Sequence, residues 1–166
     1  MANTYTLINS YTATGSVANI EFTSIPATFT DLVVKASLRG STNGNIDMLC
    51  QFNGVTTGYT FRWITGDGAA AGSASGSTTN AGFMDMNNDT ASTFASNELY
   101  IPNYLSSNNK STSFDGVTEN NATTAYMVLG ARLSTITSAI TSVKLLPSPG
   151  NFVQYSTAYL YGISKS

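Results

Sequence analysis

The sequence predicts an all-β protein, an antiparallel β-sandwich or barrel with little or no helix. Short segments of alternating polarity are separated by turn residues, which is typical of such folds. Hydrophobic residues make up 42% of the 166 residues, enough for a core. No segment carries an apolar stripe at helical spacing. A chain of this length fits one domain, so residues 1–166 are predicted to form a single domain.

The first half of the chain shows the clearest alternation. In the third segment, Leu32 and Val34 begin one apolar face that Ala36 and Leu38 continue. Asn43–Gly44 predicts a hairpin turn after this segment, because Asn-Gly favours the turns that join paired strands. Strands are predicted at 5–11, 16–22, 31–39, 46–52 and 59–64.

A run rich in Gly, Ala, Ser and Thr separates the two halves. Such residues bury little apolar area, so residues 66–80 are predicted to form an exposed mobile loop within the domain. The last predicted strand of the second half places one set of residues on a shared face: Tyr155, Thr157, Tyr159, Tyr161 and Ile163. Strands are predicted there at 98–101, 111–117, 125–132, 139–146 and 154–163.

The composition argues against catalysis. The chain has no histidine, one cysteine and 10% charged residues, against about 25% in an ordinary domain. Without histidine, Ser-His-Asp and Cys-His arrangements are impossible, and a typical zinc or iron site is not expected. No cofactor or metal is predicted. We interpret Cys50 as a small buried hydrophobe rather than a reactive thiol.

Two classes of partner are not expected. The seven Lys and Arg residues are scattered and the net charge is -2, whereas nucleic-acid binding needs clustered positive charge. No apolar run approaches the roughly 18 residues of a membrane span. The N-terminus lacks the pattern of a signal peptide, so the chain is expected to be made in a cytoplasm.

One aromatic cluster is a candidate contact site. Tyr59, Phe61 and Trp63 alternate along one strand face, and such rings can stack on a glycan or anchor a protein interface. The alternative, ordinary packing in the core, is the interpretation that we favour.

Two acidic groups are weaker candidates. Glu98, Asp115 and Glu119 lie on or beside neighbouring predicted strands and could converge for glycoside hydrolysis; turn capping is the favoured alternative. The segment from Asp85 to Asp89 resembles the start of a calcium loop, but it lacks the glycine and glutamate that follow in such loops, which favours a polar turn.

An ordered set of segments resembles small virion structural proteins of tailed bacteriophages, and the resemblance covers nearly the whole chain. No single segment is specific; the order carries the resemblance. The segments are Ile25-Pro26, Thr30 to Leu32, Gln51 to Gly54, Glu98 to Tyr104, Val117 to Asn121, Ala139 to Leu145, Gly150 to Phe152 and Tyr159 to Ile163.

The resemblance implies a β-sandwich of jelly-roll type and a non-enzymatic place in the virion. The leading expectation is a capsid decoration (cement) protein, a homotrimer that binds the major capsid protein and stabilises the head shell. The alternative is a tail-fibre or tail-tip module that binds a receptor or glycan. A third reading, from the acidic residues alone, is a polysaccharide-degrading jelly-roll enzyme.

Overall fold

The computed structural model of the chain describes residues 4–85, 88–119, 121 and 125–164. These residues form twelve β-strands and no helix. The strands are β1 (Tyr5–Thr12), β2 (Ile20–Phe22), β3 (Asp31–Leu38), β4 (Ile46–Phe52), β5 (Tyr59–Gly66), β6 (Ala71–Gly76), β7 (Asn80–Met84), β8 (Ala95–Ile101), β9 (Lys110–Val117), β10 (Met127–Ser134), β11 (Val143–Ser148) and β12 (Thr157–Ile163).

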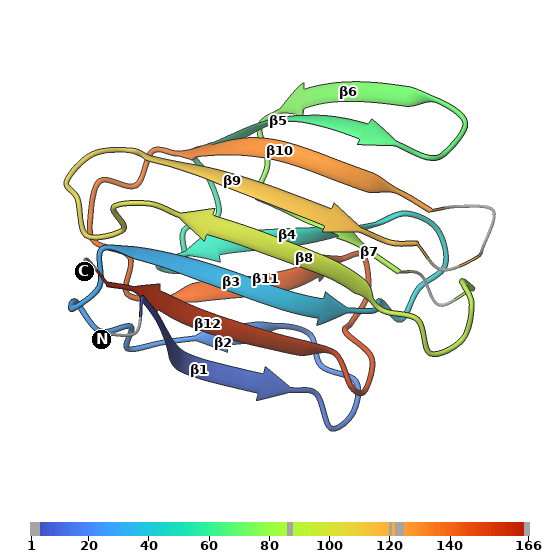
Figure 1. Cartoon of the computed structure of the whole chain (residues 1–166), viewed down its shortest axis with the longest axis horizontal. Helices are drawn as coiled ribbons and strands as arrows, with labels where there is room; N and C mark the ends of the chain where they lie inside the picture. The colour runs from blue at the N-terminus through green and yellow to red at the C-terminus, as the bar shows by residue number, and fades with distance from the viewer. Residues whose placement is uncertain (1–3, 86–87, 120, 122–124, 165–166) are drawn as a thin grey trace.

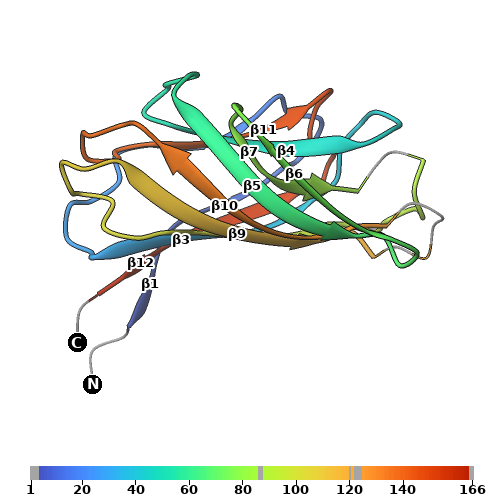
Figure 2. The same ribbon diagram turned by 90° about the horizontal axis from the view of Figure 1, so that it is seen from above.

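The strands form two sheets. One has eight strands in the order β1-β12-β3-β8-β9-β10-β5-β6, and the other has four in the order β2-β11-β4-β7 (Figure 1). Every pair of neighbouring strands is antiparallel. Figure 2 shows the two layers from above, with β4, β7 and β11 on one side. The predicted all-β, antiparallel sandwich is confirmed.

The strand order is compatible with the jelly-roll type. A jelly roll divides two Greek keys between two sheets, and this chain crosses repeatedly from one sheet to the other between β2 and β5. In the larger sheet, the β9–β10 hairpin lies between β8 and β5.

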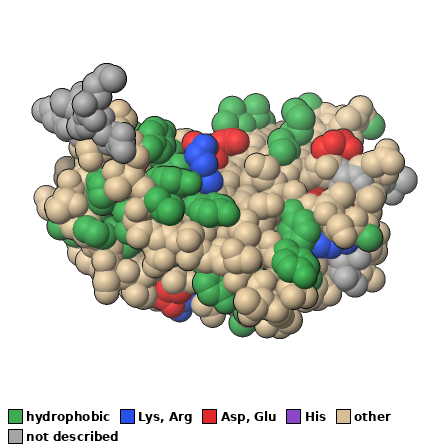
Figure 3. Space-filling view, turned by 60° about the horizontal axis from the view of Figure 1, so that its bottom comes forward, with side chains coloured by type: hydrophobic (Ala, Val, Ile, Leu, Met, Phe, Trp, Pro, Cys, Tyr) green, Lys and Arg blue, Asp and Glu red, His purple; other side chains and the backbone are tan. Residues whose placement is uncertain are grey.

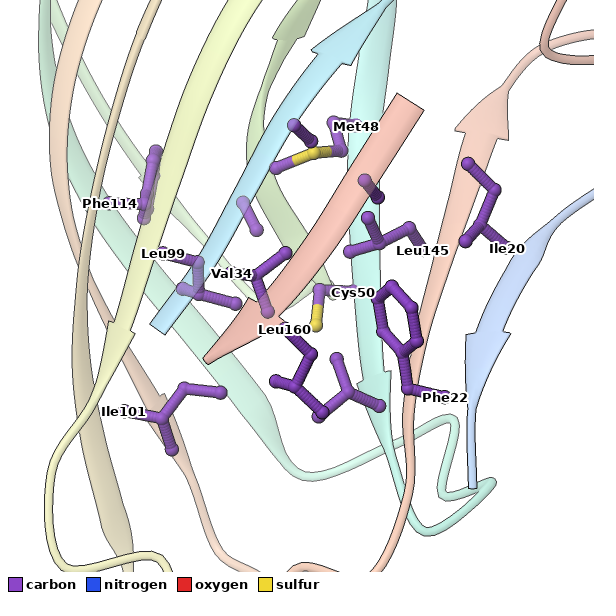
Figure 4. Close-up of a cluster of buried hydrophobic side chains, with 14 of the residues drawn as sticks. Ile20, Phe22, Val34, Met48, Cys50, Leu99, Ile101, Phe114, Leu145 and Leu160 are labelled. Carbon is purple, nitrogen blue, oxygen red and sulfur yellow. The ribbon is translucent and has the colours of Figure 1, made fainter. Parts of the chain in front are cut away.

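A single hydrophobic core lies between the sheets. Figure 4 shows side chains from both layers pointing toward one another, among them Val34, Leu99 and Leu160 from the large sheet and Met48 and Cys50 from the small one. The alternating burial of β3, β4 and β9 produces this arrangement, because every second side chain faces inward. Cys50 is buried, as predicted.

Three basic residues are buried beside this core. Arg39 donates to backbone carbonyls in the segment 89–93. Lys110 donates to carbonyls of its own loop and of Ile136. Arg132 donates to the Cys50 carbonyl, and its guanidinium lies 4.9 and 4.4 Å from the centres of two aromatic rings. Buried positive charge therefore satisfies backbone carbonyl oxygens, which would be costly to bury without partners.

The hairpin predicted at Asn43–Gly44 is wrong. β3 and β4 lie in different sheets, and the turn carries the chain from one layer to the other. Both edges of β3 are already occupied, by β12 and β8. No edge of β3 remains for β4, whatever the local preference of the turn.

The loop predicted at 66–80 is also wrong. Its middle part, Ala71–Gly76, forms β6, which pairs along its whole length with β5; the first residue of the segment ends β5 and the last begins β7. β6 is an edge strand whose residues are exposed, except Gly76, which is partly buried. Two strands can pair through their backbones without burying side chains, and small side chains do not obstruct this pairing. A low content of large apolar residues therefore does not exclude a strand, which is why the prediction from composition was wrong.

Smaller differences concern the ends of strands. The segment predicted at 16–22 is a strand only at β2, and the one at 139–146 begins later, at β11. The Asn53 side chain explains the second difference. It accepts hydrogen bonds from the backbone N–H groups of Thr141 and Ser142 and donates to the Ala139 carbonyl. Residues 139–142 therefore bond to the Asn53 side chain and to backbone groups outside the strands, such as the Tyr104 carbonyl, instead of forming part of β11.

Candidate functional site

The outward face of the eight-stranded sheet carries a row of aromatic, basic and acidic side chains. Strand register places Tyr159, Lys35, Glu98 and Asp115 side by side on β12, β3, β8 and β9. Side chains directly opposite on antiparallel strands lie about 5 Å apart. These residues therefore form one continuous row across four strands.

Tyrosines stand at the β12 end of this row. The rings of Tyr159 and Tyr161 lie 6.5 Å apart between centroids at 31°, and Tyr5 meets Tyr161 edge-on at 6.3 Å. Tyr159 is 38% exposed and Tyr5 is 51% exposed. Figure 3, which brings the β1 end forward, shows hydrophobic side chains gathered beside basic and acidic ones. The tyrosines thus form a small aromatic platform that solvent reaches.

Charged groups form the middle of the row. Lys35 Nζ and Glu98 Oε2 lie 2.6 Å apart, and this contact raises the pKa of Lys35. Burial raises the pKa of Asp115, and the charge of the neighbouring Glu98 raises it further. One positive and two negative groups leave this part of the surface with a net negative charge.

These side chains line a groove with a volume of about 390 Å³. Tyr159 and Tyr161 form one side of it, and the serine hydroxyls of Ser37 and Ser96 lie beside the charged residues. Ligand pockets in proteins start at about 300 Å³, so the groove is large enough for a small ligand. We call it the tyrosine groove.

A second feature of the same face is apolar. Ile64, Met127 and Leu129 are 61%, 63% and 58% exposed, and Val117 is 42% exposed. They belong to β5, β9 and β10, which are neighbours, and they line a hollow of about 330 Å³. We call these four residues the apolar patch. Large exposed apolar side chains gathered together, unlike scattered ones, mark an interaction surface.

The aromatic cluster considered as a candidate contact site lies on the inward face of the large sheet, opposite the groove and the patch. Tyr59 and Phe61 are buried, and Trp63 stacks on Phe61 at 4.2 Å between ring centroids. Trp63 also packs against Phe83 of β7 at 5.2 Å. These three side chains occupy the inward face of β5, so a glycan or partner cannot reach Tyr59 and Phe61. The favoured alternative, packing in the core, is the arrangement found.

The acidic candidates separate into two places. Glu98 and Asp115 converge, as Cα partners on adjacent strands. Glu119 lies beyond β9 and lines a different hollow, together with Tyr126 and Met127. Its carboxylate accepts a hydrogen bond from the backbone N–H of Asn121, which is the turn-capping role considered for it.

The calcium-loop candidate is only partly visible. Met86 and Asn87 lie outside the described residues; Asp85 and Asp89 are buried. Arg39 donates to the Asp89 carbonyl at 3.0 Å. Among the described residues, no group of three or more metal-ligating side chains is close enough to hold an ion. No helix within the described ranges is long and apolar enough to cross a membrane.

The sequence contained one signal for the tyrosine groove. The last predicted strand placed Tyr159 and Tyr161 on one face, and that face is the outward one, because Ala158 and Leu160 are fully buried. Nothing in the sequence placed Lys35 or Asp115 beside them, since β3, the β8–β9 pair and β12 are far apart along the chain.

The fold and this surface define a β-sandwich protein with a candidate binding face. Neither the known protein-family models nor the curated proteins contain a match to the chain.

The raised pKa of Asp115 predicts a pH-dependent stability. The folded state holds a proton on Asp115 more strongly than the unfolded chain does, so the ionised carboxylate opposes folding at neutral pH. This cost disappears as pH falls through the raised pKa. We expect Asp115→Asn to melt at a higher temperature than the parent at pH 7, and the difference to vanish near pH 3.

Asp67 provides a control of opposite sign. Backbone N–H groups of Ala70 and Ala69 lower the pKa of Asp67, so its charge favours the folded state at neutral pH. Asp67→Asn should not raise the melting temperature at pH 7. If Asp115→Asn and Asp67→Asn changed the melting temperature in the same way at every pH, the opposite effects of the two carboxylates on folding would be contradicted.

Proposed function

We propose that the chain is a non-enzymatic structural protein of a bacteriophage virion, a decoration protein that binds the head shell as a homotrimer. The observation that carries the proposal is the apolar patch on the outward face of the large sheet. A protein with such a patch gains free energy when the patch is covered, at roughly 25 cal/mol per Å² of apolar surface buried.

The composition supports permanent contact. Few charges lower the desolvation cost of covering a surface, and neutral hydroxyl and amide side chains keep the free chain hydrated. The resemblance of the ordered segments to phage virion proteins supports the assignment to a particle. In this proposal the apolar patch contacts the major capsid protein, and the finished virion is where the protein acts.

The arrangement of the carboxylates supports a non-enzymatic role. Glycoside hydrolysis needs two carboxyl groups on opposite sides of the scissile bond. Glu98 and Asp115 extend side by side from the same face of one sheet, and Glu98 is bound to Lys35. Release of reducing sugar from a polysaccharide by the purified protein, lost in Asp115→Asn, would contradict this part of the proposal.

Two measurements test the proposal. Purified virions should contain the protein at hundreds of copies, located on the shell by electron microscopy. Added to shells that lack it, the parent protein should bind, whereas Leu129→Glu should bind at least tenfold more weakly while keeping the parent melting temperature. Thr60→Glu, on the outward face of β5 away from the patch, is the control and should bind like the parent.

The alternative, a tail-fibre or tail-tip module, predicts a different copy number and location of the protein in the virion. A handful of copies on the tail, with none on the shell, would contradict the decoration role. Light scattering of the purified protein tests the trimer separately, and a monomer at all concentrations would contradict it.

A further inference from the structure

We propose that the tyrosine groove binds a saccharide, either neutral or amino-substituted, through the platform of Tyr159 and Tyr161 and the carboxylate of Asp115. This goes beyond the structural role proposed above and does not depend on it. The groove and the apolar patch adjoin at Asp115, which lines both hollows; Tyr159 and Tyr161 line the groove and Leu129 the hollow of the patch, so variants of these residues test the two properties separately.

The aromatic platform suits the apolar faces of sugar rings. The two tyrosine rings are tilted by 31° to each other, and their centroids are 6.5 Å apart, so they lie side by side along the groove. Both rings belong to β12, whose inward neighbours Ala158 and Leu160 are fully buried in the core. A strand fixed in this way presents the rings without a large ordering cost on binding.

Polar groups at the other side of the groove suit sugar hydroxyls. An ionised carboxylate accepts hydrogen bonds only, and a serine hydroxyl both donates and accepts. Asp115 has no ion-pair partner among the described residues, where Lys35 pairs with Glu98 instead. Asp115 is therefore available to accept hydrogen bonds from a ligand's hydroxyl or ammonium groups.

Charge decides between classes of saccharide. The groove holds one lysine, already paired, and two carboxylates. This net negative charge repels phosphates, sulfates and uronic acids. An ammonium group is attracted both by the carboxylates and by the tyrosine faces, so amino sugars fit along with neutral ones.

The tyrosines of the groove are accessible to solvent, unlike the aromatic residues on the inward face of β5. Tyr59 and Phe61 are packed inside the sandwich, whereas Tyr159 is 38% exposed at the groove. Aromatic residues on the inward face serve stability, and the ones on the outward face of β12 contribute little to the core. Tyr159 and Tyr161 lie beside the Lys35–Glu98 ion pair and beside Asp115, which has no ion-pair partner in the described part of the chain. Because these rings add little to the core, they are available for ligand binding.

The experiment uses a glycan array carrying neutral, amino-sugar and acidic oligosaccharides, followed by calorimetry with chitosan hexamer and maltoheptaose. We expect binding to neutral or amino-sugar glycans and none to acidic ones. Tyr159→Ala should lose at least tenfold in affinity, Tyr159→Phe should bind like the parent, and Asp115→Asn should weaken binding to the amino sugar most.

Tyr11→Ala is the matched control. Tyr11 is 37% exposed, close to the value for Tyr159, but its partner in the sheet is Ala158, so it faces away from the groove. It should bind like the parent. Tyr161→Ala repeats the test if Tyr159→Ala does not fold. The proposal is overturned if no neutral or amino-sugar glycan binds, if acidic glycans bind best, or if the Tyr159 and Tyr11 variants lose affinity equally.

Discussion

Gly130→Ala is expected to lower the free energy of unfolding by about 3 kcal/mol, at the upper end of the usual cost of overpacking a core. A Cβ atom at Gly130 would lie 2.2 Å from Phe114 Cζ and within 2.7 Å of two further atoms of the same ring. Phe114 is 1% exposed, so the ring has no open space to enter. For a chain of this size the melting temperature should fall by roughly 6–12 °C.

The register explains why this glycine is sensitive. Gly130 is the Cα partner of Phe114 on β9 and of Trp63 on β5. The two rings meet over it edge to face, with centroids 6.4 Å apart. Because Gly130 has no side chain, the rings of Phe114 and Trp63 can meet across β10. This contact connects the hydrophobic core to the aromatic cluster of β5.

A control and a rescue make this prediction specific. Gly66 lies at the end of β5 with no atom within 4 Å of its would-be Cβ and no positive φ, so Gly66→Ala should change stability by less than about 0.5 kcal/mol. Phe114→Leu removes the ring that obstructs the new methyl group. The double variant should therefore be more stable than the sum of the two single effects by about 1 kcal/mol or more. Strict additivity in urea unfolding would contradict the steric explanation.

Local pattern was enough to predict most strands. Burial alternates at every residue of β4 and β9 and from Val34 onward in β3. In β3 and β4 the printed sequence shows the same alternation of apolar residues. A period of two follows directly from strand geometry, so it needs no knowledge of the partner strands. The all-β class could therefore be predicted from each segment separately, without knowing which strands pair.

Which face of a strand turns inward was harder to predict. β5 buries Tyr59 and Phe61, but β12 exposes Tyr159 and buries Ala158 and Leu160. Both faces of β12 are apolar enough to be core, and only the neighbours decide. Gly162 lies inward, and the ring of Phe29 fills the space beside it, 2.3 Å from where a Cβ would lie. Such contacts between distant segments cannot be seen in one sequence.

Most strand partners could not be predicted from local sequence patterns. The hairpin signal at Asn43–Gly44 was sound as turn chemistry, yet β3 pairs with β12 and β8 instead of β4. The tyrosine groove depends on the same long-range pairing, since Lys35, Glu98 and Asp115 come from three strands. The possible convergence of Glu98 and Asp115 was recognised, but their neighbours Lys35 and Tyr159 were not.

Lys110→Met is expected to destabilise the protein by about 3 kcal/mol, because buried acceptors left unsatisfied cost about 1–3 kcal/mol each. Lys110 is 1% exposed, and its ammonium group donates to the carbonyls of Ser106, Asn108 and Ile136 at 2.7, 2.6 and 3.3 Å. Burial lowers the pKa of Lys110, and these three oxygens offset that cost. Water can reach Asn108, which is exposed, so the full cost falls on the other two carbonyls.

The same substitution at the surface provides the comparison. Lys35 is half exposed and pairs with Glu98, and exposed ion pairs contribute about 0–1 kcal/mol, so Lys35→Met should melt within a few degrees of the parent.

Hydrogen exchange tests the Lys110 contacts locally. Loss of Lys110 removes the link between the 102–109 loop and the segment after β10, so the Ser106 amide, which bonds to the Asn103 carbonyl, should exchange faster. The amides of the β5–β6 hairpin, which Lys110 does not contact, should be unchanged. If both lysine variants melt alike, the carbonyls do not depend on the ammonium group, and water or a loop rearrangement satisfies them instead.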